Sequence, residues 1–189
     1  MSRAGVCVAL SCLLTVVLSA TAGAAVIDPQ ASAIGFSLKT RWGQELQGRF
    51  PRYEGEIATL ADGRHQVRLR LSTGEVEIIG SPRFTRITRG PGFFDASRHR
   101  AVVFESDAFA RELMRDGGRL AGELTIRGRH QREVFVLEPA ACPRPGVDCD
   151  VIAAGSVRRS DYGVDRWGMA VSDIVRFTLR VRVQGDLDQ

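Results

Sequence analysis

Alternation of apolar and charged residues is the feature that most constrains the fold of this chain. Residues 175–183, VRFTLRVRV, have valine, phenylalanine or leucine at every second position and arginine or threonine between them. Residues 66–72 (QVRLRLS), 33–39 (AIGFSLK) and 74–80 (GEVEIIG) repeat the pattern. Successive side chains of a strand point to opposite faces, so this period of two predicts antiparallel strands with one buried and one solvated face.

Turn residues separate these segments, and helical periodicity is weak outside two short stretches. Asp62-Gly63 and Gly117-Gly118 are expected turns. Residues 109–118, FARELMRDGG, have room for one or two helical turns before the glycine pair. Within residues 81–99 we expect a short helix capped at Asp95 or Ser97, its length limited by glycine and proline.

Many amphipathic strands without long helices leave two architectures, a sandwich of two sheets or a closed barrel. Arginine occupies consecutive outward positions, as at Arg68 and Arg70 or at Arg180 and Arg182. That face therefore meets solvent rather than a second sheet, which favours a barrel. A barrel of about eight strands either fills its interior with side chains or holds one small ligand, and the alternation is consistent with both.

The first 24 residues have the features of a secretory signal peptide. Arg3 supplies the positive start, residues 6–18 are apolar, and Ala22-Gly23-Ala24 has the small-x-small pattern that signal peptidase recognises. The apolar run is shorter than the roughly 20 residues that span a bilayer. We therefore expect export to the periplasm, cleavage near Ala24 and one domain over residues 25–189.

Two cysteines, Cys142 and Cys149, remain after Cys7 and Cys12 are removed with the signal peptide. They flank a Pro/Gly-rich turn, and in an oxidising compartment such a pair indicates a disulfide that closes a loop. A redox or metal-binding pair is the alternative. The spacing is wider than CxxC, and no histidine lies nearby in the sequence to complete a zinc site.

Arginine carries nearly all the positive charge of the chain. Removing Arg3 from the 26 lysines and arginines leaves 25 basic residues against 22 acidic ones. They occur in ones and twos rather than in clusters, which together with export argues against a nucleic-acid partner. Transient contact with an anionic membrane surface, or a phosphate-bearing ligand, is compatible with this charge.

The sequence contains no motif that we associate with catalysis. A GxSxG elbow, an HExxH pair, a phosphate-binding glycine loop and an HxE…CxxC set are all absent. His65, His99 and His130 are separated along the chain and have polar neighbours, so we interpret them as surface or hydrogen-bonding residues rather than metal ligands. Asp161 and Asp173 are expected in turns or caps. We expect no enzymatic activity, no metal and no cofactor.

Four motifs, in this order, resemble the YceI-like family of exported bacterial proteins. Residues 26–57 contain an Ile-Asp-Pro start, a Gly-Phe strand, a Gly-x-Phe and a closing Gly-x-Ile. Residues 93–106 resemble the family's FFD…F-x-S signature, and residues 122–128, GELTIRG, resemble its most recognisable strand. RRSDYG at residues 158–163, followed by VSDIVRFTLRV at residues 171–181, is similar to its ending.

The resemblance implies an all-β fold, an eight-stranded antiparallel lipocalin-like barrel with one or two short helices. It also implies an elongated apolar cavity that accepts a polyisoprenoid lipid, either an isoprenoid quinone or a polyprenyl phosphate. The protein would then be a periplasmic carrier or reservoir for this lipid.

A polyisoprenoid is branched hydrocarbon, so its site needs apolar walls, and burial at about 25 cal/mol per Å² supplies the affinity. The candidate wall residues are Phe36, Phe93, Phe94, Phe104, Leu124, Ile126, Phe177 and Leu179. Arg89, just before a Gly-Pro-Gly kink, is a candidate contact for a phosphate head group. The alternative for Arg89 is a solvated loop arginine.

A second function is compatible with the same strands. The protein would be an interaction module that docks onto a membrane redox or stress-response complex and carries no lipid. This alternative predicts a filled interior and an apolar patch on the outside of the barrel. A continuous apolar tunnel of several hundred Å³ would favour the lipid carrier instead.

Overall fold

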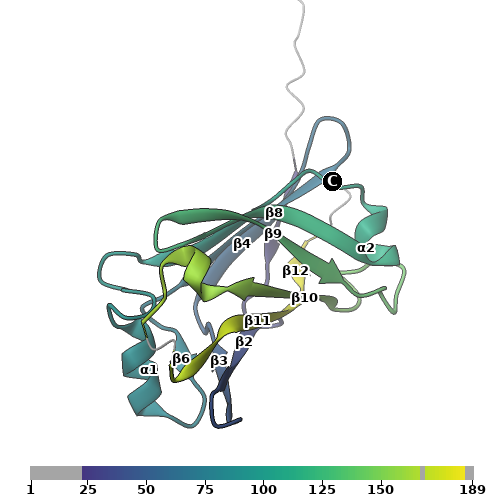
Figure 1. Cartoon of the computed structure of the whole chain (residues 1–189). Helices are drawn as coiled ribbons and strands as arrows, with labels where there is room; N and C mark the ends of the chain where they lie inside the picture. The colour runs from purple at the N-terminus through teal and green to yellow at the C-terminus, as the bar shows by residue number, and fades with distance from the viewer. Residues whose placement is uncertain (1–22, 167–168, 186–189) are drawn as a thin grey trace, which may run out of the picture.

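One curled antiparallel sheet, with two short α-helices at its ends, makes up residues 23–166 and 169–185, which are the residues that the computed structural model describes (Figure 1). The predicted signal peptide, residues 1–24, lies outside them except for Gly23 and Ala24, and so do Cys7 and Cys12. Within the described ranges, neither helix is long and apolar enough to cross a membrane.

The sheet contains twelve strands in the described part of the chain, in the order β12-β1-β4-β5-β7-β8-β9-β10-β11-β2-β3-β6. Their bounds are β1 Ala24–Ile27, β2 Ala33–Thr40, β3 Glu45–Arg49, β4 Tyr53–Thr59, β5 His65–Ser72, β6 Glu77–Ile78, β7 Ala101–Ser106, β8 Gly118–Ile126, β9 Arg129–Leu137, β10 Val151–Arg158, β11 Val171–Val181 and β12 Val183–Gln184. All pairings between these strands are antiparallel, as predicted.

The predicted count of eight strands was wrong, because several long strands are interrupted by bends. Residues 28–32 separate β1 from β2, residues 50–52 separate β3 from β4, and Arg182 alone separates β11 from β12. Alternation in the sequence indicates which face of the sheet a side chain occupies. A bend that does not change the order of inward and outward residues leaves no trace in this pattern, so the breaks between strands could not be predicted.

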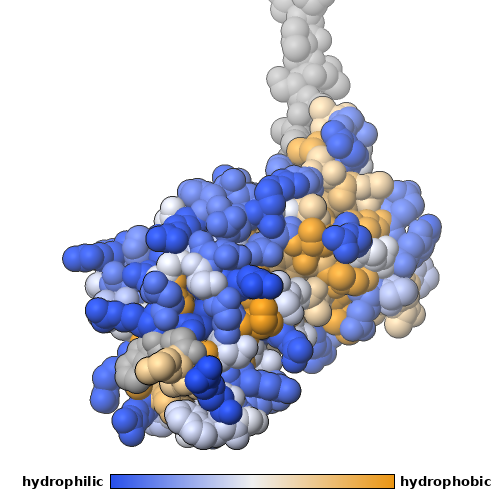
Figure 2. Space-filling model, in the orientation of Figure 1, coloured by the Kyte–Doolittle hydropathy of each residue, from blue (hydrophilic) through white to orange (hydrophobic). Residues whose placement is uncertain are grey.

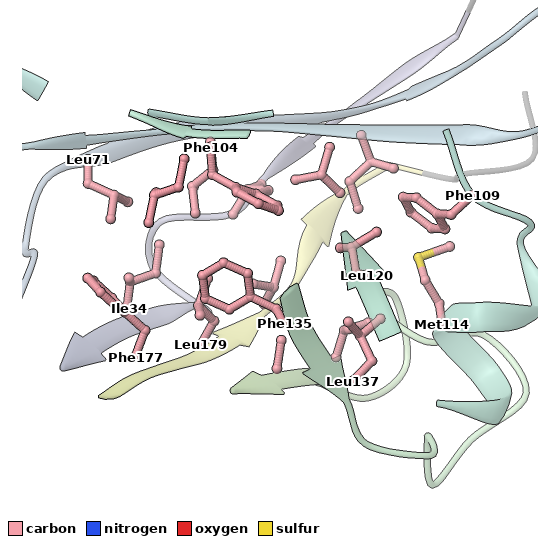
Figure 3. Close-up of a pocket in the computed structure, with 18 of the residues that line it drawn as sticks. Ile34, Leu71, Phe104, Phe109, Met114, Leu120, Phe135, Leu137, Phe177 and Leu179 are labelled. Carbon is pink, nitrogen blue, oxygen red and sulfur yellow. The ribbon is translucent and has the colours of Figure 1, made fainter. Parts of the chain in front are cut away.

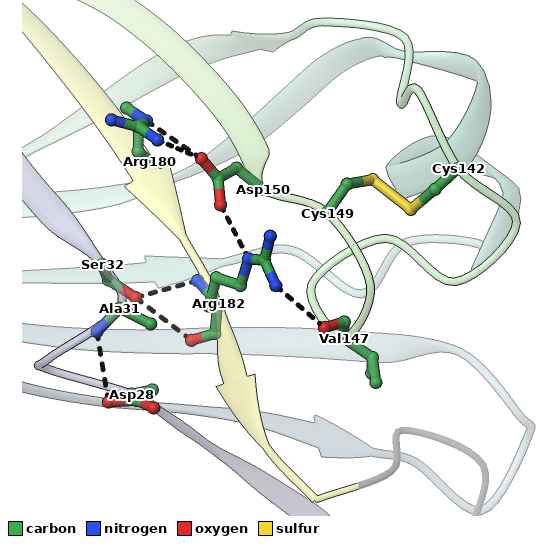
Figure 4. Close-up of polar contacts among 9 residues, drawn as sticks. All are labelled: Asp28, Ala31, Ser32, Cys142, Val147, Cys149, Asp150, Arg180 and Arg182. Atoms are coloured by element: carbon green, nitrogen blue, oxygen red, sulfur yellow. Dashed lines mark hydrogen bonds and ion pairs between the residues drawn. A yellow bond between two sulfur atoms is a disulfide. The ribbon is translucent and has the colours of Figure 1, made fainter.

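The bend at Arg182 lets the sheet close on itself (Figure 4). β11 pairs with β10 and β2, whereas β12, one residue later, pairs with β1 at the other side of the sheet. The backbone of Arg182 holds this corner, since its carbonyl accepts from the Asp28 N–H at 2.8 Å and its N–H donates to the Ser32 hydroxyl at 2.8 Å. The result is a barrel-like fold.

The side chain of Arg182 ties the same corner to the cysteine loop. Its guanidinium donates to the Asp150 carboxylate at 2.7 Å and to the Val147 carbonyl at 3.2 Å, and Asp150 also pairs with Arg180 (Figure 4). The predicted Cys142–Cys149 disulfide is present, with the two Cα atoms 6.1 Å apart. It closes the loop that contains Val147 and ends one residue before Asp150.

The inward faces follow the predicted alternation. On β2, Ile34, Phe36 and Leu38 are buried. On β5, Leu69 and Leu71 are buried, whereas Arg68 and Arg70, which alternate with them, are exposed. The core is therefore the space inside the curled sheet rather than a layer between two sheets.

Helix α1, Pro82–Arg89, begins earlier than predicted. Its cap is Ser81, whose hydroxyl accepts from the Phe84 N–H at 3.3 Å, and Pro82 occupies the first helical position. Serine followed by proline is a favourable helix start, so the prediction of a cap at Asp95 or Ser97 was wrong. Those two residues lie in the turns after the helix, where the Ser97 hydroxyl donates to the Asp95 carboxylate at 3.0 Å.

Two further helical segments flank the sheet. Helix α2, Glu112–Asp116, forms in the predicted stretch and ends at Gly117, which has a positive φ of 74°. A single 3-10 turn, η1, covers Arg159–Tyr162 directly after β10. Helices α1 and α2 lie at opposite ends of the curled sheet (Figure 1).

Candidate functional site

The interior of the sheet contains an apolar cavity of about 80 Å³, called here the main cavity. Side chains from two opposing parts of the sheet point into it, and Phe109 and Met114 line it at the α2 end (Figure 3). All its lining residues are apolar, among them Ile34, Leu71, Phe104, Leu120, Leu124, Phe135, Leu137, Phe177 and Leu179. A ligand in this cavity would therefore contact only hydrocarbon, aromatic rings and one thioether.

A second cavity of about 50 Å³ lies at the end of the interior next to α1 and is called here the α1-side cavity. Its lining combines apolar side chains with three polar ones, Thr88, Arg159 and Tyr162. Phe93 and Phe94 also line it and are only partly buried, so this cavity lies close to the protein surface. The interior thus has an apolar end and a more polar end.

A series of phenylalanine rings separates the two cavities. Phe177 lines both, and its ring centroid lies 6.1 Å from that of Phe36 and 6.5 Å from that of Phe135. Phe135 in turn lies 4.9 Å from Phe104 in an edge-to-face arrangement, and Phe36 lies 6.4 Å from Phe94. Phe177 therefore forms a wall that the two cavities share.

Glycines on neighbouring strands make room for three of these rings. A Cβ atom on any of the three glycines would come far inside normal contact distance of the ring that covers it. The closest distances are 2.2 Å for Phe36 over Gly48, 2.6 Å for Phe104 over Gly122 and 2.7 Å for Phe135 over Gly155. The rings therefore lie against the barrel wall, and a larger residue in place of any of these glycines would push its ring into the interior.

The structure places all eight predicted wall residues on a cavity wall. Phe104, Leu124 and Leu179 line the main cavity, Phe36, Phe93, Phe94 and Ile126 line the α1-side cavity, and Phe177 lines both. Their contact with a ligand remains a prediction. Sequence reasoning did not identify Phe109, Met114 or Phe135, of which the first two lie outside the strands.

Arg89, the predicted head-group contact, lies outside both cavity walls. Its side chain donates to the Val76 carbonyl at 2.9 Å, and a contact with a head group remains a prediction. Arg159, which sequence reasoning missed, does line the α1-side cavity and is only 6% exposed. A signal for it was present, because Arg159 follows Val157 by two residues and so keeps its inward direction.

The Arg159 guanidinium is held by main-chain carbonyls of the segment that leads into β11. It donates to the carbonyls of Ser172 at 2.9 Å and Arg166 at 2.8 Å, and also to that of Val164. Burial lowers the pKa of Arg159, while the Asp173 carboxylate opposes this effect. Arg159 therefore shapes the wall beside the cavity and places a cation near it.

Tyr162 closes a gap between two strands. β9 and β10 pair at only two positions, Ala153 with Leu137 and Ala154 with Val136. The η1 turn covers the gap, where Tyr162 is 1% exposed and its hydroxyl donates to the Glu133 carboxylate at 2.8 Å. Burial raises the pKa of Glu133, and burial together with that carboxylate raises the pKa of Tyr162.

His65, His130 and Asp173 have roles of the predicted kind. The His65 ring is buried and hydrogen-bonded, with Nδ1 3.3 Å from the Thr59 hydroxyl and its centroid 6.0 Å from that of Phe109, whereas His130 is exposed and lies 2.9 Å from a Glu123 carboxylate oxygen. Asp173 has the predicted capping role, since it accepts from the N–H and the hydroxyl of Ser160. Among the described residues, no group of three His, Cys, Asp or Glu side chains could hold a metal ion.

A model of the YceI-like domain family matches residues 26–183. Among curated proteins, no sequence matches this chain significantly.

The fold is similar to several solved structures. Burkholderia cenocepacia BcnA aligns with a TM-score of 0.69 and 16% identity, over 84% of this chain and 99% of BcnA. A polyisoprenoid-binding domain from Saccharophagus degradans, implicated in plant cell wall breakdown, aligns with a TM-score of 0.63 and 12% identity, over 87% and 100% of the two chains. A Campylobacter jejuni YceI protein has a TM-score of 0.54 and 15% identity, over 74% and 85%. At these identities the similarity is one of fold.

Proposed function

Because this chain belongs to the YceI-like domain family, we propose that it binds a polyisoprenoid lipid inside its curled sheet, without catalysis. The observation that carries the proposal is the composition of the main cavity, whose lining residues are all apolar. Few ligands match such a wall except hydrocarbon chains, since a polar ligand would lose hydrogen bonds to water and gain none. The polyisoprenoid-binding domain from Saccharophagus degradans, which has a similar fold, supports the same ligand class.

The cavities are too small to hold a long lipid unless side chains move. Volumes of about 80 and 50 Å³ are below the roughly 300–1,000 Å³ of most ligand sites. A long chain therefore fits only if the rings of Phe36 and Phe177 turn aside and join the two cavities. Phe94 is only partly buried and contacts Phe36, so movement on that side costs less packing than movement at the α2 end.

The two ends of the interior suggest the orientation of the lipid. We place the hydrocarbon tail in the main cavity and the head group, whether quinone or phosphate, in the α1-side cavity. Thr88, Arg159 and Tyr162 line only the latter. This arrangement supports a carrier or reservoir role, because the protein would shield the hydrocarbon tail of the lipid from water.

We assign the protein to the periplasm. Support comes from the signal-peptide pattern of residues 1–24 and from the Cys142–Cys149 disulfide, a bond that persists in oxidising compartments. Fractionation of the host followed by N-terminal sequencing of the mature protein tests this, and a chain retained in the cytoplasm with its first residues would contradict it.

The ligand is tested by native mass spectrometry of the purified protein before and after incubation with a total lipid extract. A matched pair of variants assigns the site. Ala153→Phe adds a ring to the wall of the main cavity, whereas Ala154→Phe adds the same ring to the exposed outer face of the same strand. We expect the first variant to lose bound isoprenoid and the second to keep it. Equal binding by both variants, or ligand-free wild type in every sample, would refute the proposal.

A second candidate is the interaction module without lipid, and the small cavity volume is the observation that favours it. The outside of the barrel also has apolar residues on β9 and β10, with Val136 50% exposed and Ala154 beside it (Figure 2). The same experiment separates the two functions, because a module would bind no isoprenoid and would be insensitive to Ala153→Phe.

A further inference from the structure

The end of the molecule that carries α1 exposes two large hydrophobic side chains on two segments that are joined by a backbone hydrogen bond. Trp42 is 81% exposed and Met169 is 84% exposed, the highest values among the large hydrophobic residues that the structure describes. The Arg41 N–H donates to the Ala170 carbonyl at 3.0 Å, which joins the tip of the β2–β3 hairpin to the segment before β11. Exposed apolar side chains that gather in one place commonly mark an interaction surface.

The surroundings of these two side chains are strongly basic. Residues 79–100, which contain α1, include five arginines and one carboxylate, Asp95, which is buried. Lys39 and Arg41 precede Trp42 in the hairpin and are exposed, as are Arg83 and Arg86 of α1. Two carboxylates, Glu45 and Asp165, lie among them. Figure 2 shows this end as a hydrophilic surface interrupted by apolar atoms.

Four arginines of the barrel wall are paired with carboxylates, whereas the exposed cations that the structure describes around α1 and Trp42 are not. On the wall, Arg49, Arg68, Arg132 and Arg180 each form an ion pair with a carboxylate. In the part of the chain that the structure describes, no carboxylate lies within ion-pair distance of Lys39, Arg41, Arg83 or Arg86. Because Lys39 lies opposite Glu45 in the β2–β3 pairing, the charge available to an external partner is chiefly that of Arg41, Arg83 and Arg86.

We propose that this α1 end docks onto the surface of an anionic phospholipid bilayer. Trp42 would lie among the lipid head groups, where an indole is favoured because it is apolar with one hydrogen-bond donor. The arginines of α1 would bind lipid phosphates, which match the planar guanidinium. Burying two side chains and pairing a few charges gives reversible attachment rather than insertion.

Docking at this end would also place the α1-side cavity next to the bilayer. Thr88 of α1 and Phe93 and Phe94 after it line that cavity, so its wall is built from the same segment that contacts the lipid phosphates. An isoprenoid would then pass between bilayer and barrel without crossing water. This transfer step depends on the proposed function, whereas the docking itself does not.

Sedimentation with vesicles tests the docking on protein freed of bound lipid. We expect binding to vesicles of 70% phosphatidylcholine and 30% phosphatidylglycerol, loss of binding in high salt, and little binding to pure phosphatidylcholine. The variant Arg83→Glu/Arg86→Glu should bind the anionic vesicles about 30-fold more weakly. Trp42→Ser should bind about tenfold more weakly.

Matched controls carry the same changes elsewhere on the surface. Arg70→Glu/Arg119→Glu alters two exposed arginines of the barrel wall, and Val136→Ser alters an exposed apolar residue of β9. Both controls should bind as wild type does, and all variants should melt at the wild-type temperature. The proposal is overturned if wild type ignores anionic vesicles, or if the controls lose as much binding as the α1-end variants. Neither result would change isoprenoid binding measured by mass spectrometry, so the two proposals fail separately.

Discussion

Replacing Gly155 with alanine tests whether the glycine–phenylalanine pairs control the space inside the barrel. The new Cβ would lie 2.7 Å from Cδ1 and 2.9 Å from Cε1 of Phe135, whereas ordinary contacts begin at 3.4 Å. The ring must therefore move by about 0.7 Å. Its free side faces the main cavity, whose volume is about 80 Å³, so we expect it to move there.

The expected cost differs between stability and binding. Overpacking typically costs about 1–3 kcal/mol of unfolding free energy. Replacing glycine with alanine also lowers the conformational entropy of the unfolded chain, which offsets about 0.4–1 kcal/mol of that loss. A cavity that accepts the ring should bring the net loss of unfolding free energy to roughly 1 kcal/mol or less. For the lipid, losing contact worth two methylene groups at about 0.8 kcal/mol each weakens the dissociation constant about 15-fold.

Two measurements check this, urea denaturation of the ligand-free protein and titration with a fluorescent isoprenoid. Gly74→Ala is the control, since its Cβ would meet only the Ser72 hydroxyl at 3.9 Å. Adding Phe135→Leu to Gly155→Ala should recover part of the affinity, because the smaller side chain leaves the cavity free. The reasoning is refuted if Gly155→Ala leaves the affinity unchanged, or if it destabilises the protein by several kcal/mol while the double variant does not recover.

Three further predictions concern Phe94 at the α1-side cavity, the Glu133–Tyr162 hydrogen bond and the Cys142–Cys149 disulfide. Phe94→Ala should weaken lipid binding more than stability, with a loss of unfolding free energy below the roughly 3–5 kcal/mol of a packed phenylalanine, because Phe94 is only partly buried; urea denaturation and lipid titration compare the two. Because the pKa of Glu133 is raised in the folded chain, the folded chain binds a proton more tightly than the unfolded chain does. The stabilisation that this gives is complete below the unfolded pKa of about 4.3 and should be lost as the pH rises through the folded pKa. Glu133→Gln keeps an acceptor for the Tyr162 hydroxyl and should flatten that slope in denaturation curves between pH 4 and 7; an unchanged slope would contradict the assignment. Cys142→Ser/Cys149→Ser should lower the unfolding free energy by about 2–3 kcal/mol. Reductant should destabilise the wild type but not this variant, and an equal destabilisation of both would show that the disulfide is not the cause.

The cavity walls could be predicted from the sequence because the direction of a side chain in a strand is a local property. Phe36 and Phe177 are on inward positions of alternating segments, and each points inward wherever its strand lies in the sheet. The same rule explains why His65, which was predicted to be at the surface or hydrogen-bonded, is the buried and hydrogen-bonded case. Its neighbours Arg64 and Gln66 are polar and exposed, but they are one residue away, so the histidine between them is directed inward.

Features that depend on which strands lie side by side could not be predicted in this way. The fit of Phe135 over Gly155 requires the register of β9 against β10, and the Tyr162–Glu133 hydrogen bond requires the gap between these strands. The bend at Arg182 has no local signal either, because its partners Asp28 and Ser32 are near the other end of the described chain. Tertiary contacts determine these features.

The closure at Arg182 has a consequence for how the chain acquires its structure. Ser32 and Arg182 are 150 residues apart, and β1, near the N-terminal end of the described residues, pairs with β12, near their C-terminal end. Contacts of such high sequence separation slow folding, since a long loop must be closed before they contribute. The sheet therefore cannot close into a barrel until β12 is available to pair with β1, so closure is expected to be a late step of folding.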